Sequence, residues 1–381
     1  MAGNFEAEFA IGHAALEGDP TSVWGRLVVD CVSQLGPLAA RAELGFVYVT
    51  DHLAVHLGEI TALLRQSTGI RSWVGTVGIG IIATGTEYFD RPALAVMAAA
   101  LPQGSWHLLE SGGLLPAAAR AWTTPGAPMA APVLGVVHAD PRTPDLPEAV
   151  AALAGEIGGF LVGGLSSSRG AFDQVAGGIA RGGISGVLFQ PGLTVITGLS
   201  QGCSPIGPVR TITGAQQNVV FEIEGRPALD VLKEDIGEVL SRKLERVAGY
   251  IHAAFPVSGS DTGDYLVRNL VGIDIDRGWV AVGEEIAAGD RLLFVRRDRQ
   301  AAEDDLVRML QRVKRGCAVP PRGGLYFSCI ARGPNLFGGD SAELRLVRRE
   351  LGDIPLVGMF CNGEISNNRL YGYTGVLALF A

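Results

Sequence analysis

The chain has 381 residues, of which 48% are hydrophobic and 18% charged, a composition typical of a globular protein with two or three domains. Its net charge of −8 argues against a general nucleic-acid surface, because phosphate binding requires clustered Lys and Arg. The first residues lack the pattern of a signal peptide, and no apolar stretch approaches the ~20 residues of a spanning helix. We therefore expect a cytoplasmic protein with neither nucleic acid nor membrane among its partners.

The five cysteines are odd in number and form no CxxC pair, so neither a disulfide framework nor a thiolate zinc site is indicated. Reduced thiols suit a cytoplasmic location. His52 and His56 resemble half of a metal site, but the sequence nearby offers no third ligand, and a cap by Asp51 at a helix entry is favoured. We predict no metal site.

In chain order, residues 1–29 are predicted to be an N-terminal arm, with strand character from Phe9 to Ala14 and a helix from Trp24. A unit of strand, helix, strand and strand follows, at residues 45–50, 56–67, 70–77 and 93–98. Its glycine-rich run 78–83 mimics a dinucleotide fingerprint. Residues 84–92 then read as a loop and not as the helix that such a fingerprint requires.

The same order of elements recurs twice. The second copy is predicted at residues 133–138, 147–157, 160–164 and 184–189, and the third at 324–329, 341–351, 355–360 and 374–380. Three occurrences of one order predict internal duplication. The polar segments after the second strand of each copy then occupy equivalent places, at 78–81, 165–169 and 361–364, and we expect them to line related pockets.

Different material separates the second and third copies. We predict strands and helices there at residues 219–223, 227–242, 265–275, 279–282, 291–295 and 300–314. The Pro- and Gly-rich segment 202–214 is the predicted seam between two halves. The predicted fold class is therefore α/β (α+β), with two domains, mixed β-sheets flanked by helices, and repeated strand-helix-strand-strand units.

Two isolated motifs suggest chemistry. Ser200 stands in Gly-Leu-Ser-Gln-Gly, the nucleophile-elbow pattern of hydrolases, but Pro205 and Pro208 disfavour the helix that must follow. His252 stands alone in apolar company, as an axial haem ligand would, although buried and hydrogen-bonded histidines are commoner. Neither motif leads us to predict a catalytic residue.

The richest polar group closes the chain, and it contains Cys361, Asn362, Glu364, Arg369, Tyr371 and Tyr373. A glutamate and an arginine flanked by amide and phenol groups suit the ammonium and carboxylate of an amino acid, since each desolvated charge needs a partner. The alternative is a turn in which Glu364 and Arg369 pair with each other. Cys361 is an alternative nucleophile, but no base stands near it in the sequence.

Several phrases resemble the FIST family, whose members are bacterial sensory modules for small ligands. Residues 73–76, 85–88, 163–167 and 200–208 resemble FIST N, and residues 265–274, 361–364 and 373–375 resemble FIST C. The resemblance implies a FIST N-like domain at 30–209 and a FIST C-like domain at 210–381. FIST domains accompany kinase, cyclase or chemoreceptor modules, so a stand-alone member implies a separate signalling protein. Some relatives bind haem and sense nitric oxide.

Our leading hypothesis is a sensory protein in signal transduction that binds a small polar metabolite, with an amino acid as first candidate. The predicted ligand-binding residues are Ser166, Ser167, Cys203, Arg332, Cys361, Asn362, Glu364, Arg369 and Tyr371. The second hypothesis is a haem-based nitric-oxide or gas sensor with His252 as ligand, and no other cofactor is predicted. The third is an enzyme, either a hydrolase using Ser200 or a thiol enzyme using Cys361. Open edges of the duplicated sheets are where we expect a homo-oligomer to form.

Overall fold

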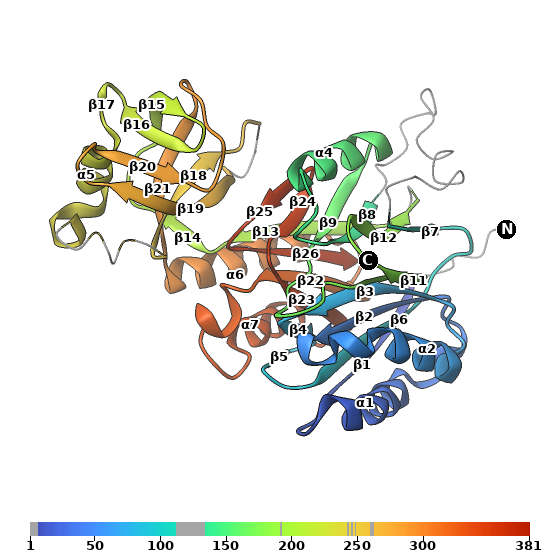
Figure 1. Ribbon diagram of the computed structural model, residues 1–381. Coiled ribbons are helices and arrows are strands. Elements are labelled where there is room, and N and C mark those ends of the chain that lie inside the picture. Colours follow the sequence, from blue (N-terminus) through green and yellow to red (C-terminus); the bar gives the residue numbers. More distant parts are fainter. Residues whose placement is uncertain are drawn as a thin grey trace. The chain divides into compact units, whose positions relative to one another are not determined.

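The computed structural model describes residues 7–111, 134–190, 193–241, 244, 247, 249–259 and 263–381. The chain divides into two compact units (Figure 1). Unit 1 comprises Met1–Ser200, Asp305–Leu370 and Thr374–Ala381, and unit 2 comprises Gln201–Asp304 and Tyr371–Tyr373. Both units contain β-sheets and helices, which confirms the predicted α/β (α+β) class. All three copies of the predicted repeat lie in unit 1.

The three repeats of unit 1 have the predicted order of elements. The first contains β1 (Glu8–Ala15), α1 (Pro20–Leu35), η1 (Gly36–Ala40), β2 (Leu44–Thr50), η2 (Asp51–His56), α2 (Leu57–Thr68), β3 (Ser72–Gly78), β4 (Gly80–Ala83), β5 (Thr86–Phe89) and β6 (Ala93–Ala100). The second contains β7 (Trp106–Leu109), β8 (Leu134–Ala139), α4 (Leu146–Ile157), β9 (Phe160–Leu165), β10 (Gln174–Ala176), β11 (Gly178–Ala180) and β12 (Ile184–Phe189). The third contains β13 (Val195–Gln201), α6 (Arg299–Gly316), β22 (Gly323–Cys329), η5 (Gly333–Asn335), α7 (Ala342–Leu351), β23 (Leu356–Cys361), β24 (Glu364–Asn367), β25 (Arg369–Tyr371) and β26 (Thr374–Phe380).

Strand pairing confirms the duplication. In each repeat the first core strand pairs in parallel with the strand after its helix and antiparallel with the returning strand: β2 with β3 and β6, β8 with β9 and β12, and β22 with β23 and β26. The glycines Gly75, Gly163 and Gly358 hold the same register position. A Cβ there would lie 1.7 to 1.8 Å from the carbonyl oxygen of the paired core strand, which explains why each repeat has glycine at this point.

Each repeat contributes a hairpin that pairs with a strand of another repeat. Strand β4 of the first repeat pairs with β23 of the third, β10 of the second pairs with β3 of the first, and β24 of the third pairs with β9 of the second. The result, among the described residues, is three six-stranded sheets in unit 1. The prediction of a loop over residues 84–92 is wrong in part, because Thr86–Phe89 forms β5 and pairs with β4. Its short length and Gly85 turn concealed the hairpin from sequence reasoning.

A shared core joins the three sheets. Alternate residues of all three repeats enter one cluster, and Tyr48, His138 and Phe327 meet there edge to face with ring centroids 5.5 to 6.2 Å apart. These three residues are equivalent by register, so the repeats converge on their own matching positions. On the outer faces, α1 and α2 cover the first sheet and α4 covers the second (Figure 1). Gly69 ends α2 and Gly158 ends α4 in the left-handed conformation.

Unit 2 is built around a closed barrel. Its elements are β14 (Cys203–Pro205), β15 (Arg210–Gln216), β16 (Val219–Ile223), β17 (Arg226–Pro227), α5 (Ala228–Ser241), β18 (Ile251–Pro256), β19 (Tyr265–Asp274), β20 (Trp279–Val282) and β21 (Arg291–Arg297). Strands β21, β15, β16, β20, β19 and β18 pair in that order, and β18 pairs back with β21. The barrel interior is apolar, and residues of α5 pack into the same cluster. At Gly237 the chain of α5 leaves the helical conformation.

Candidate functional site

The polar segments that follow the second strand of each repeat meet one another, as equivalent loops would. Ser167 joins all three repeats: its N–H donates to the Val77 carbonyl at 3.2 Å, its hydroxyl donates to the Phe360 carbonyl at 2.5 Å, and the Ile79 N–H donates to that hydroxyl at 2.8 Å. The neighbouring Ser166 hydroxyl shares a hydrogen bond of 2.6 Å with Thr76. Both serines are buried and their hydroxyl groups have protein partners. They therefore hold the repeats together at this place.

Glu364 lies where the hairpin of the third repeat joins the second. The carboxyl is fully buried, and its Oε2 accepts hydrogen bonds from the Thr374 N–H at 3.1 Å and the Thr374 hydroxyl at 2.9 Å. Its Oε1 has no hydrogen-bond partner within the described part of the chain, although the Cys329 thiol lies beside the carboxyl. Burial raises the pKa of Glu364 to about 8, against the opposing effect of the Thr374 hydrogen bonds. At neutral pH the group is therefore mainly protonated.

Cys361 occupies the last position of β23, in register with Cys329 of β22. Its side chain is buried against Gly164, where a Cβ would meet the sulfur at 2.2 Å. Burial and the nearby Glu364 raise the pKa of the Cys361 thiol well above its ordinary value. Because the thiolate is the nucleophilic form, this environment disfavours a reactive cysteine.

Arg332 is fully buried beneath α7 and is surrounded by hydrogen-bond acceptors. Its guanidinium forms an ion pair with Glu343 at 2.9 Å and reaches the carbonyl and hydroxyl oxygens of Ser200 at 3.4 and 3.5 Å. Glu343 also accepts hydrogen bonds from the hydroxyls of Tyr326 and Ser328 at 2.7 and 2.9 Å. Ser200 lies within β13 and is buried, which is not the exposed turn that a nucleophile elbow requires.

The remaining predicted residues are dispersed. Cys203 and Tyr371 belong to unit 2, where both are buried and the Cys203 carbonyl accepts a hydrogen bond of 2.6 Å from Tyr265. Asn362 is exposed, and the Arg369 guanidinium donates to Asn368 at 3.4 Å. Glu364 and Arg369 thus have different partners, so the structure does not form the turn in which these two pair with each other.

His252 lies on β18 of unit 2 and is fully buried. Its ring packs on Tyr373 with centroids 4.4 Å apart, and neither ring nitrogen makes a hydrogen bond within the described residues, although the Asn269 side chain lies beside the ring. Burial, reinforced by Arg297, lowers the pKa of His252 to about 4. The imidazole is therefore neutral, which is the form that ligates metals.

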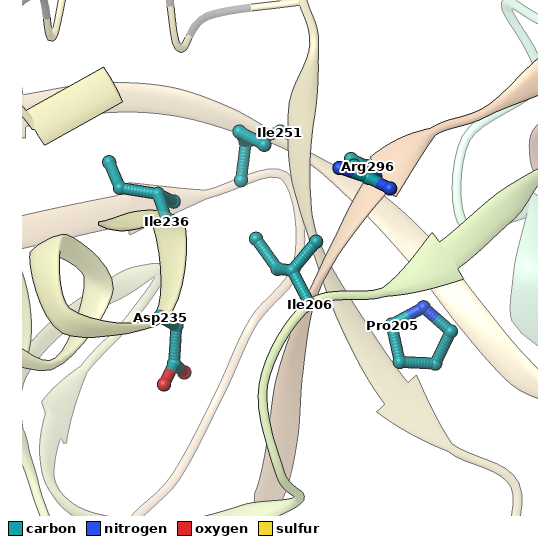
Figure 2. A pocket seen from close by; sticks show the side chains of 6 residues that line it. All are labelled: Pro205, Ile206, Asp235, Ile236, Ile251 and Arg296. Atoms are coloured by element: carbon teal, nitrogen blue, oxygen red, sulfur yellow. The ribbon is translucent and has the colours of Figure 1, made fainter. Parts of the chain in front are cut away.

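A pocket of about 300 Å³ lies in unit 2. Figure 2 shows the six residues that line it, which are Pro205, Ile206, Asp235, Ile236, Ile251 and Arg296. Its volume is at the lower end of the range of small-molecule sites. None of the nine ligand-binding residues predicted from the sequence lines it.

The pocket combines an apolar floor with two charges. Ile251 and Ile236 belong to the barrel core, and Ile206 packs against it. Asp235 and Arg296 lie on opposite sides in Figure 2, with Ile206 between them. Sequence reasoning missed this site because its residues come from four separate segments and form no motif. The signal present was the phrase at residues 200–208, which includes Pro205 and Ile206.

The described residues also bear on metal binding and on membrane insertion. In the part of the chain that the structure describes, no group of three or more His, Cys, Asp or Glu side chains is arranged to hold a metal ion. Over the same residues, every helix is too short or too polar to cross a membrane.

Comparison with known proteins places the chain in a family. Residues 43–226 match the FIST N domain and residues 228–367 match the FIST C domain, so the chain belongs to the FIST family. FIST domains are sensory domains for small ligands in signal transduction. An uncharacterized protein of Mycobacterium tuberculosis is 32% identical over 381 residues, covering 90% of this chain and 94% of the relative. An uncharacterized protein of Mycobacterium bovis is 31% identical over 210 residues, covering 53% of this chain and 54% of the relative.

Similarity to solved structures is low. The T. maritima PurL structures complexed with FGAR and with ATP are each 12% identical to this chain, with TM-scores of 0.20 and 0.22. The alignments cover 98% of this chain and 72% and 71% of those chains.

Proposed function

We propose that this protein senses a small polar metabolite in signal transduction and takes that ligand in the pocket of unit 2. The observation that carries the proposal is a pocket of about 300 Å³ in which charged side chains border isoleucines. Most small-molecule sites have this character, with an apolar lining and few polar groups that fix orientation. An amino acid, the ligand class that the sequence favoured, is the first compound class to test.

The buried polar residues of unit 1 support the same choice of site by contrast. Ser167 and Arg332 are both buried, and their side chains form hydrogen bonds within the protein itself. A ligand would have to break those bonds, which leaves buried groups unpaired at a cost of about 1 to 3 kcal/mol each. In the pocket, Arg296 imposes no such cost on entry, because its side chain is 48% exposed.

Native mass spectrometry of protein purified directly from cells tests the proposal. We compare the wild type with Ile206→Trp, which fills the pocket, and with Val209→Trp, which adds the same side chain at a residue 39% exposed and outside the lining. We expect a small added mass on the wild type and on Val209→Trp, and a bare chain for Ile206→Trp. An added mass that Ile206→Trp retains, with an unchanged circular dichroism spectrum, would contradict the proposed site.

A haem-based gas sensor is the second candidate function, and His252 is the observation in its favour. A neutral imidazole without a hydrogen bond to either nitrogen suits haem ligation in its chemistry, whereas the packing does not, because the ring is enclosed and lies on Tyr373. This candidate requires a Soret band that His252→Ala abolishes. Wild-type protein that stays colourless after reconstitution with haem excludes it.

The proposal extends to the route of the signal. We propose that the ligand-bound protein acts on a separate signalling protein in the cytoplasm and that it does so as a homo-oligomer. Support comes from outer strands such as β1 and β5, which within the described residues pair with a neighbouring strand on one side only, because such edge strands favour strand addition. Size-exclusion chromatography with light scattering checks the oligomer, and a mass equal to the single chain at all concentrations contradicts it.

A further inference from the structure

The two charged residues of the unit 2 pocket differ in how far they are already engaged. The Asp235 side chain is 4% exposed, and its two oxygens accept hydrogen bonds from the Arg210 guanidinium at 2.6 and 3.2 Å. This is the two-point arrangement that makes Arg–carboxylate pairs strong. The backbone of Gly207 also lies close to this carboxylate, since a Cβ there would be 2.4 Å from it. A ligand ammonium would therefore compete with a buried, satisfied ion pair.

Arg296 presents the opposite case. Its side chain is 48% exposed, and the guanidinium donates through one nitrogen to Asp298 at 3.3 Å. Exposed pairs of this kind contribute about 0 to 1 kcal/mol. A guanidinium carries five N–H donors in a planar fork that matches a carboxylate. The anionic end of a ligand can therefore bind Arg296 without displacing a stabilising interaction.

The rest of the lining offers hydrocarbon. Ile206, Ile236 and Ile251 contribute branched aliphatic side chains, and Pro205 lacks a backbone N–H donor. Burying a ligand methylene against such a surface contributes about 0.8 kcal/mol. Figure 2 shows Asp235 and Arg296 on opposite sides of this floor.

We infer that the pocket of unit 2 selects a small aliphatic carboxylate, with Arg296 holding the carboxylate and the three isoleucines holding the hydrocarbon chain. The inference rests on the proposed function and names the ligand class of the same site. An ammonium group on the ligand contributes no binding, because Asp235 is engaged by Arg210. Such an ammonium group lowers the affinity of the ligand, because it loses its hydration in the pocket and gains no partner there.

Four five-carbon compounds separate these contributions by isothermal titration calorimetry on the full chain. Pentanoate carries only the carboxylate, norvaline adds an ammonium on the next carbon, 5-aminopentanoate adds it at the far end, and pentylamine carries the ammonium alone. We expect pentanoate to bind tightest, the two amino acids at least tenfold more weakly, and pentylamine not at all. Tighter binding of either amino acid than of pentanoate would overturn the inference and leave the proposed function standing. The same conclusion would follow if none of the four compounds bound while the wild type still showed the added mass that Ile206→Trp loses in native mass spectrometry.

A pair of variants checks the role of Arg296. Arg296→Gln removes the charge and loses only an exposed ion pair, so the variant should keep the wild-type unfolding midpoint. Arg299→Gln is the matched control, because Arg299 is 60% exposed, pairs with Glu303 and lies outside the lining. We expect Arg296→Gln to lower the affinity for pentanoate at least tenfold and Arg299→Gln to leave it within twofold. Equal affinity of Arg296→Gln and the wild type would overturn the assignment.

Discussion

Arg332 and Arg296 carry the same guanidinium group in two opposite settings. Arg332, in unit 1, is fully buried, pairs with Glu343 at 2.9 Å and also reaches Ser200. Arg296, in unit 2, is 48% exposed, borders a pocket and pairs through one nitrogen with Asp298. The first arginine donates its hydrogen bonds to groups of the protein, and the second retains N–H donors that a ligand can use. Polar side chains that a sequence singles out can thus serve the fold, while the ligand site lies elsewhere.

A comparison among the repeats supports this division. Tyr326 and Ser328 lie on the outer face of β22, and both donate to Glu343. By register, the first repeat has Val47 and Val49 at these two positions, and Val137 is the second repeat's equivalent of Tyr326. One repeat therefore uses a buried polar network where its siblings use aliphatic packing. Such a network is compatible with stability only while every member keeps its partner.

The largest expected effect is on that network. Glu343→Gln leaves the buried Arg332 charge without its counter-ion, so we expect the free energy of unfolding to fall by about 3 to 5 kcal/mol. Urea denaturation measures it. As a control, Arg299→Gln removes an exposed ion pair of similar composition and should change stability by less than about 0.5 kcal/mol. Equal stability of Glu343→Gln and wild type would show that the network does not hold the third repeat.

A pH-dependent effect of similar size is expected at Glu364. Its folded pKa of about 8 lies above the ordinary value of 4.5, so between these pH values the folded state keeps a proton that the unfolded state has lost. Stability therefore falls as pH rises through this window, by about 1.4 kcal/mol for each unit of pKa difference. Glu364→Gln removes the titrating group, and we expect the variant to gain stability over the wild type between pH 5 and 8.

Another repeat already has a glutamine at the position equivalent to Glu364. Gln174 occupies the equivalent position in the hairpin of the second repeat, opposite Thr76 as Glu364 is opposite Gly164. It is buried and accepts a hydrogen bond of 2.5 Å from Ser185. Urea midpoints of the wild type and Glu364→Gln at pH 5, 6, 7 and 8 provide the measurement. Parallel pH profiles for the two proteins would contradict the raised pKa.

Much of the fold of unit 1 was predictable because local sequence patterns indicate the helices and strands of each repeat. Helical spacing located α2 and α4, and apolar runs located the core strands. The exchange of hairpins was not predictable in the same way. Strand β4 pairs with β23, and this register joins Ile82 to Gly358 across the length of the chain. Local pattern does not encode a partner at that distance.

The candidate site was harder to predict for a related reason. Sequence reasoning favoured Glu364 and Arg369 because opposite charges close in sequence suggest one site, but in the folded chain they face different neighbours. Asp235 and Arg296 are far apart in the sequence, and the packing of α5 against the barrel brings them to one pocket. Only the sequence similarity of residues 200–208 to the FIST family pointed to the pocket, because this segment includes Pro205 and Ile206.

The most direct test of the account is a calorimetric titration of pentanoate into Arg296→Gln and Glu364→Gln side by side, with wild type as reference. We expect Arg296→Gln to lose at least tenfold in affinity, because the pocket of unit 2 holds the carboxylate, and Glu364→Gln to bind as the wild type does. The reverse result, with affinity lost in Glu364→Gln and kept in Arg296→Gln, would move the ligand to the buried centre of unit 1 and contradict the account.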